Sequence, residues 1–104
     1  MPGICFRQVR TLISLADVLE LLDFVPVSSW GQQVRGPCPI HRSASPRSRS
    51  FSANLRSNAF HCFKCGAAGN QLDLYAAVQG MTVFDAALAL CASWHRPIPW
   101  IHRW

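Results

Sequence analysis

Two short motifs of metal-ligating residues, far apart in the sequence, constrain the fold of this chain more than any other feature. They are Cys38-Pro39-Ile40-His41 and Cys62-Phe63-Lys64-Cys65. Two residues separate the ligands of each motif, so one tight turn can aim both side chains at a single tetrahedral ion, and Zn²⁺ prefers such Cys/His sets. The sequence therefore predicts one zinc ion held by Cys38, His41, Cys62 and Cys65. Four protein ligands would close its coordination shell, which is typical of a structural rather than a catalytic metal.

Three other interpretations of these motifs are weaker. Iron–sulfur clusters normally require four thiolates, whereas one ligand here is His41. Redox chemistry at Cys62 and Cys65 would need a surrounding βαβ pattern, which the sequence lacks. The third alternative is two unrelated thiol pairs beside a coincidental histidine. His61 precedes Cys62 on a predicted strand and should point to the opposite face, as an exposed or ligand-facing residue.

The size of the chain makes a metal useful for stability. Its 104 residues fit one domain with a modest hydrophobic core. No apolar run approaches the roughly 20 residues that a membrane-spanning helix needs, and residues 1–10 lack the apolar stretch of a secretory signal. We therefore expect a cytoplasmic protein without a membrane partner.

The pattern of apolar residues, capping residues and turns predicts an α+β fold. Ser14 and Asp17 have the spacing of a capping box at the start of a helix, and Gly80 is placed to end a later one. The expected architecture is a small antiparallel-sheet zinc ribbon with about three packed helices. The predicted helices span 14–23, 71–79 and a segment after Thr82, and the predicted strands span 30–36, 51–53 and 59–63. The predicted divisions are an arm at 1–10, the ribbon domain at 11–95 and a tail at 96–104.

Basic residues are concentrated in the middle of the chain. The net charge is +5, and no acidic residue lies between Phe24 and Leu72. Such a distribution is typical of a surface that binds a polyanion, although a solvated Arg-rich loop would look similar. The basic residues of this stretch are Arg35, Arg42, Arg47, Arg49, Arg56 and Lys64.

Aromatic residues are interleaved with these charges. A sheet with basic edges and exposed rings suits single-stranded nucleic acid, because bases stack on the rings while cations follow the backbone. Only alternate strand positions face outward, and we expect Phe51 and Phe63 to pack inward. At most one or two rings would then be left to stack on bases.

The sequence shows no catalytic constellation. It has no cluster of carboxylates for a two-metal nuclease or polymerase site, no Walker-type phosphate loop, and no readable Ser-His-Asp or Cys-His group apart from the metal ligands. We expect no enzymatic activity from this chain on its own.

The two motifs and their flanks resemble the zinc-binding domain of bacterial DNA primases. The resemblance rests on Gly36-Pro37-Cys38-Pro39-Ile40-His41, on Ser45-Pro46 with Ser50-Phe51-Ser52, and on Phe60-His61-Cys62-Phe63-Lys64-Cys65-Gly66. It extends over about residues 11–93. It implies a zinc ribbon that helps to recognise single-stranded template DNA during primer synthesis in DNA replication.

The resemblance also implies residue roles and partners. It gives the same four zinc ligands, and it makes Arg35, Arg42, His61 and Lys64 template-facing candidates. Arg47 and Arg49 are added because they leave the first motif in a Ser/Arg-rich loop that is longer than the family pattern. The polymerase domain of the family has no counterpart in this sequence, so a separate primase catalytic chain or another replication protein is the implied partner. The alternative is a protein-interaction module that docks through Trp94, Trp100 and Trp104 and does not bind DNA.

Overall fold

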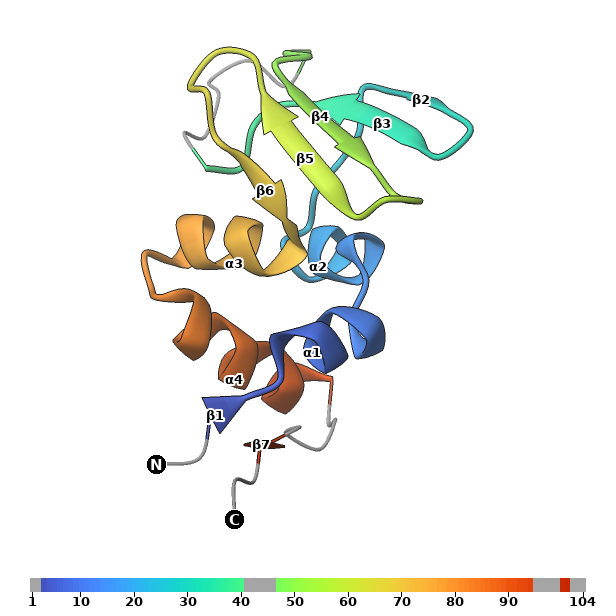
Figure 1. The fold of residues 1–104 in the computed structure, drawn as a ribbon. Coiled ribbons are helices and arrows are strands. Elements are labelled where there is room, and N and C mark those ends of the chain that lie inside the picture. Colours follow the sequence, from blue (N-terminus) through green and yellow to red (C-terminus); the bar gives the residue numbers. More distant parts are fainter. Residues whose placement is uncertain (1–2, 41–46, 95–99, 102–104) are drawn as a thin grey trace.

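The computed structural model describes residues 3–40, 47–94 and 100–101. In this part of the chain it contains four helices, a five-stranded sheet and a two-stranded sheet (Figure 1). The helices are α1 (Phe6–Leu12), α2 (Leu15–Leu21), α3 (Gln71–Gln79) and α4 (Val83–Ser93). The strands are β1 (Gly3–Ile4), β2 (Ser28–Trp30), β3 (Gln33–Gly36), β4 (Phe51–Asn54), β5 (Ala59–Cys62), β6 (Ala68–Asn70) and β7 (Trp100–Ile101).

The larger sheet is an antiparallel meander in the order β2-β3-β4-β5-β6. Each strand pairs with the next in the sequence, and Phe51 of β4 lies opposite Cys62 of β5. This arrangement confirms the predicted α+β class and the β4–β5 hairpin. The single strand predicted over 30–36 is confirmed only over its second half, as β3. The chain turns there at Gly31, whose positive φ of 58° favours a tight two-residue turn between Trp30 and Gln33.

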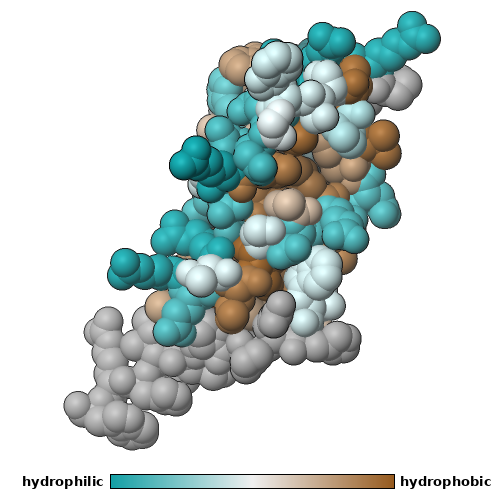
Figure 2. Space-filling view, turned by 90° about the vertical axis from the view of Figure 1, so that its right-hand side faces the viewer, coloured by the Kyte–Doolittle hydropathy of each residue, from teal (hydrophilic) through white to brown (hydrophobic). Residues whose placement is uncertain are grey.

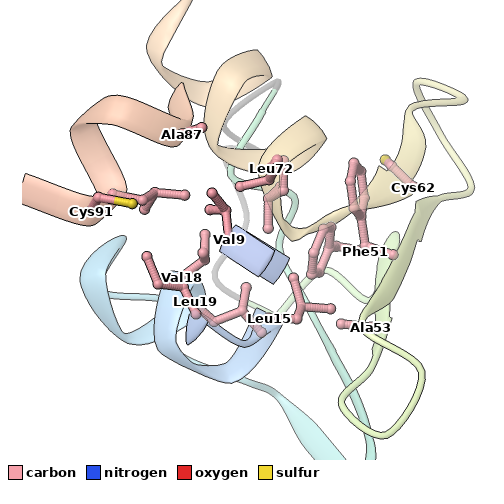
Figure 3. Packing of buried hydrophobic residues seen from close by; sticks show 14 of the residues in the cluster. Val9, Leu15, Val18, Leu19, Phe51, Ala53, Cys62, Leu72, Ala87 and Cys91 are labelled. Atoms are coloured by element: carbon pink, nitrogen blue, oxygen red, sulfur yellow. The ribbon is translucent and has the colours of Figure 1, made fainter. Parts of the chain in front are cut away.

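Buried residues alternate along the two central strands, and this alternation attaches the sheet to the helices. Phe51 and Ala53 of β4 and Phe60 and Cys62 of β5 are buried. The ring of Phe51 lies 5.7 Å from that of Phe60, measured between centroids. In Figure 3, Phe51 and Ala53 face Leu15 of α2 and Leu72 of α3. The predicted inward position of Phe51 is therefore confirmed.

Capping side chains fix where the helices begin. Ser14 and Asp17 form the predicted capping box of α2. Asn70 and Asp73 form a second capping box at the start of α3, and Gly80 ends α3 in a left-handed conformation with φ of 65°. Thr82 accepts a hydrogen bond from the backbone N–H of Asp85 at the start of α4. These local bonds satisfy backbone groups that a helix end would otherwise leave without partners.

Helix α1 was not predicted. With it, the described part of the chain has four helices instead of the expected three. Helix α1 buries Val9 against the core, and Ile13 directly after it is also buried. Its N-cap residue, Cys5, makes no capping bond through its side chain, so the sequence lacks the usual start signal. The short strands β1 and β7 pair below α1 and α4 (Figure 1).

The surface is mixed rather than uniformly polar. On the face shown in Figure 2, a hydrophobic band runs between hydrophilic side chains. No single helix of the described ranges is long and apolar enough to cross a membrane. The consecutive helices α3 and α4 meet that requirement only when taken together, and they are bent by 99° relative to each other.

Candidate metal centre and exposed sheet face

Three of the four predicted zinc ligands meet at one end of the inner strands of the sheet. The Sγ atoms of Cys38, Cys62 and Cys65 lie within 4.8 Å of one another. Cys38 follows the end of β3 and Cys62 ends β5, so the sheet brings residues of distant sequence together. Cys38 and Cys62 are buried and Cys65 is exposed. His41, the fourth predicted ligand, lies outside the described residues.

A tight turn after β5 presents the second pair of sulfurs. The backbone N–H of Cys65 donates to Sγ of Cys62 at 3.4 Å, and the N–H of Gly66 donates to the carbonyl of Cys62 at 2.9 Å. Gly66 has a positive φ of 79°, which a residue with a side chain adopts at a cost. The turn therefore depends on glycine at the point where the chain passes the sulfurs.

The surroundings of Cys62 favour the thiolate, which is the form that binds metals. Burial raises the pKa of this thiol. Hydrogen bonds from Cys65, Lys64 and Cys38 outweigh that effect and lower the pKa to about 6. Charge-stabilising hydrogen bonds of this kind are the usual means by which a protein holds an anionic sulfur.

The donor set fits a zinc ion. A tetrahedral site with Zn–S bonds of about 2.3 Å places its sulfurs about 3.8 Å apart. Sulfurs that already lie within 4.8 Å of one another need only small shifts to reach that geometry. Cys38, Cys62 and Cys65 would supply three corners of the tetrahedron. The exposed position of Cys65 leaves room for a fourth ligand.

A cation and two aromatic rings pack together on the face of the sheet that points away from the helices. Strand pairing aligns Arg35 of β3, Ser52 of β4 and His61 of β5 on that face. The His61 and Phe63 rings meet edge to face with centroids 4.6 Å apart. The guanidinium carbon of Arg35 lies 5.0 Å from the centroid of the Phe63 ring. We refer to Arg35, His61 and Phe63 as the outer-face cluster.

The exposure of Phe63 contradicts the prediction that it packs inward. The Phe63 side chain is 62% exposed. Cys62 must point inward to reach the other sulfurs, so alternation along the chain directs its neighbours His61 and Phe63 outward. The outward position of His61 is as predicted. Strand alternation applied outward from Cys62 would have identified Phe63 as part of this face.

Hydrogen bonding holds Arg35 in place. Its Nη2 donates to the carbonyl of Arg49 at 2.7 Å. Its Nε is buried and has no hydrogen-bond partner among the described atoms. Arg35 is therefore an oriented guanidinium that retains an unused donor.

The remaining predicted nucleic-acid residues differ in how far the structure describes them. Arg47, Arg49 and Lys64 are exposed. Arg42 lies outside the described residues. Trp30 was not assigned to the site, but it is 87% exposed. Register places it on the same face as Arg35, because Trp30 pairs with Gln33 and Gln33 lies two residues before Arg35.

The structure describes only some of the tryptophans that the protein-interaction alternative relies on. Trp94 is half-buried and packs against the hydrophobic core. Trp100 belongs to β7, and Trp104 lies outside the described residues. Trp94, the C-cap residue of α4, thus makes part of its contacts with the interior.

Comparison with solved structures supports the fold. The crystal structure of the Aquifex aeolicus primase, comprising zinc-binding and RNA polymerase domains, superimposes with a TM-score of 0.70 and 25% sequence identity. The match covers 88% of this chain and 21% of the primase chain.

Sequence comparison leads to the same proteins. The DNA primase of Geobacillus stearothermophilus is 30% identical over 92 residues, which is 88% of this chain and 15% of that primase. The DNA primase of Legionella pneumophila is 31% identical over 87 residues, covering 83% of this chain and 15% of its own length. The chain thus spans about 15% of the length of these primases.

A profile of the CHC2 zinc finger family matches residues 4–101, which is nearly the whole chain. The match includes both cysteine-containing motifs and every element of the sheet that brings the three sulfurs together. This chain therefore belongs to the CHC2 zinc finger family, the zinc-binding domain of DNA primases.

Proposed function

We propose that this chain is a zinc-stabilised module that binds single-stranded template DNA and supports primer synthesis by a primase polymerase domain. The observation that carries the proposal is the outer-face cluster, in which an exposed ring, a histidine and an oriented guanidinium lie together. The DNA primases among its relatives support the link to replication. A role in primer synthesis agrees with the cytoplasmic location expected from the sequence.

In this proposal one zinc ion is structural and is bound by Cys38, His41, Cys62 and Cys65. The ion would tie the end of β3 to the turn after β5, on either side of β4. Zinc binding to small finger peptides supplies roughly 10–16 kcal/mol of apparent free energy. An ion in this position would fix the spacing between Arg35 on β3 and Phe63 beside the ion, and so pre-form the binding face.

The outer-face cluster has the chemistry that a single strand requires. A base could stack on Phe63, because the ring is exposed and every base has a face to stack; such stacking contributes about 1–3 kcal/mol per base. The charged guanidinium of Arg35 beside this ring suits a phosphate oxygen. Arg47, Arg49 and Lys64, with Arg42, would follow the rest of the backbone.

The role of the chain in this proposal is positioning rather than catalysis. It would hold the template while a separate polymerase domain joins nucleotides. That domain, in the same protein or in a partner chain, is the implied partner, together with other replication proteins.

Fluorescence anisotropy with a labelled single-stranded oligonucleotide tests the proposal. Phe63→Ala should weaken binding about 5- to 100-fold, as expected from the loss of one stacked base. Phe84→Ala is the matched control, because Phe84 is 37% exposed on α4, away from the sheet. Affinity should also fall with salt, with a log–log slope of roughly −0.7 per neutralised phosphate.

If Phe63→Ala and Phe84→Ala weaken oligonucleotide binding equally, the outer-face cluster is not the binding site. An absence of oligonucleotide binding at low salt would instead favour the protein-interaction alternative.

A further inference from the structure

A small pocket lies at the other end of the β4–β5 hairpin from the cysteines. It has a volume of about 210 Å³. The hairpin register places Cys62 opposite Phe51 at one end and Ala59 opposite Asn54 at the other, next to the turn that lines the pocket. In Figure 1 this turn points toward α2, and the backbone N–H of Leu15 donates to Oδ1 of Asn58 in the turn. The pocket lining comprises Arg7, Arg10, Ser57, Asn58, Asn70 and Gln71.

Among the residues that the structure describes, two cations at the pocket have no counter-charge. Arg7 and Arg10 lie three residues apart on α1, a spacing that places side chains on the same face of a helix. Within the described ranges, neither guanidinium forms a hydrogen bond or an ion pair, and no carboxylate lines the pocket. Two adjacent guanidinium groups without an acid between them favour a ligand that carries a phosphate.

Gln71 also lines the pocket, and its side chain carries a buried acceptor. Gln71 is 1% exposed, and its Nε2 donates to the carbonyls of Arg10 and Ile13 at 3.0 and 2.9 Å. These two bonds fix the orientation of the amide and leave Oε1 buried without a partner in the described structure. A buried acceptor without a donor is costly, and a ligand that brings an N–H or O–H would relieve that cost.

The amide of Asn58 adds a donor to the set. Its Oδ1 already accepts from the backbone of Leu15 at 2.9 Å, so its Nδ2 is the group left for a ligand. The pocket thus combines two cations for an anion with an acceptor and a donor for a polar ring or sugar. A nucleotide carries all of these groups in one small molecule.

We propose that this pocket binds a single nucleotide, with its phosphate at Arg7 and Arg10 and a base or sugar donor at Gln71. The nucleotide could be free in solution or could be one unit of a nucleic-acid strand, because the chemistry of recognition is the same. None of the pocket residues belongs to the outer-face cluster or to the cysteine motifs. The proposal therefore stands apart from the proposed template-binding face.

Isothermal titration of the full zinc-loaded chain with ATP, at low salt, tests the site. Arg7→Gln and Arg10→Gln should each weaken binding about tenfold or more, since each removes charged hydrogen bonds to a phosphate. Arg56→Gln is the matched control, because it removes the same charge from the neighbouring turn without lining the pocket. Ser57→Glu is a second variant, which keeps both arginines but adds a competing carboxylate to the exposed turn. Inorganic phosphate should compete with ATP weakly.

Two further measurements assign the site and the source of the nucleotide. In the NMR spectrum, ATP should shift the side-chain amides of Asn58 and Gln71, and Phe63→Ala should leave this response unchanged. If ATP does not bind but Arg10→Gln weakens oligonucleotide binding about tenfold more than Arg56→Gln, the occupant is a unit of the strand, which also supports the site. The proposal is overturned if Arg10→Gln and Arg56→Gln have the same effect on both ligands, or if neither ligand responds to any of these variants.

Discussion

The guanidinium of Arg35 lies 5.0 Å from the centroid of the Phe63 ring, although Arg35 belongs to β3 and Phe63 lies in the turn directly after β5. Arg35 precedes Cys38 by three residues, and Phe63 directly follows Cys62. The convergence of the cysteines thus also brings the guanidinium onto the ring. Metal centre and binding face are two consequences of the same strand register.

Replacing Arg35 with lysine tests whether this geometry matters beyond charge. Arg35→Lys keeps the positive charge but loses the planar group that stacks on Phe63 and donates to the carbonyl of Arg49. We expect single-strand affinity to fall about 3- to 30-fold, since each such contact contributes about 1 kcal/mol. Anisotropy with the same oligonucleotide measures the change. Arg56→Lys, in the exposed turn, should have no effect, and an equal loss in both variants would contradict a specific role for Arg35.

Gly69 should be intolerant of any side chain. Its φ is +153°, and a Cβ atom there would meet Oδ2 of Asp73 and would lie 2.7 Å from Cβ of Asp73. Asp73 Oδ2 accepts from the backbone N–H of Asn70 in the capping box of α3. Gly69→Ala should therefore lower the free energy of unfolding by about 2–4 kcal/mol, from backbone strain and the disturbed cap.

Gly31→Ala provides the comparison for Gly69→Ala. Gly31 also has a positive φ, but a Cβ atom there would meet nothing within 4 Å. Gly31→Ala should lower the free energy of unfolding by about 1–2 kcal/mol, because of backbone strain alone. Urea unfolding of both variants measures the difference, and a larger loss at Gly31 would show that the contact with Asp73 is unimportant.

Removal of the metal should unfold the ribbon. The three sulfurs connect the ends of β3 and β5, and the domain has only a modest core to compensate. Excess chelator should therefore abolish the sheet signal in circular dichroism, and added zinc should restore it. An unchanged spectrum after verified loss of the metal would mean that the ion has no role in folding.

The sequence predicted most reliably those features whose signals are local. The capping box of Ser14 and Asp17 predicted the start of α2. The hairpin over 51–63 was predicted from two short apolar runs on either side of a polar turn. The cysteine spacing likewise identified residues that the fold then brings together. In the capping box and within each cysteine motif, the residues that carry the signal lie within a few positions of one another.

Features that depend on tertiary packing were missed. Helix α1 has no capping side chain and forms because Val9 and Ile13 are buried against the core. Strand β6 consists of Ala-Gly-Asn, which has low strand propensity, and exists because it pairs with β5. Phe63 was expected to pack inward, whereas the inward position of Cys62 directs it outward.

The zinc content of the purified, reduced protein tests the central claim most directly. Elemental analysis should give one zinc per chain for the wild type and for Cys5→Ser, a half-buried cysteine outside the cluster. Cys38→Ser, Cys62→Ser, Cys65→Ser and His41→Asn should each lose most of the metal, because each removes one of four ligands. A folded wild-type protein without zinc, or full zinc retention in Cys62→Ser, would contradict the account.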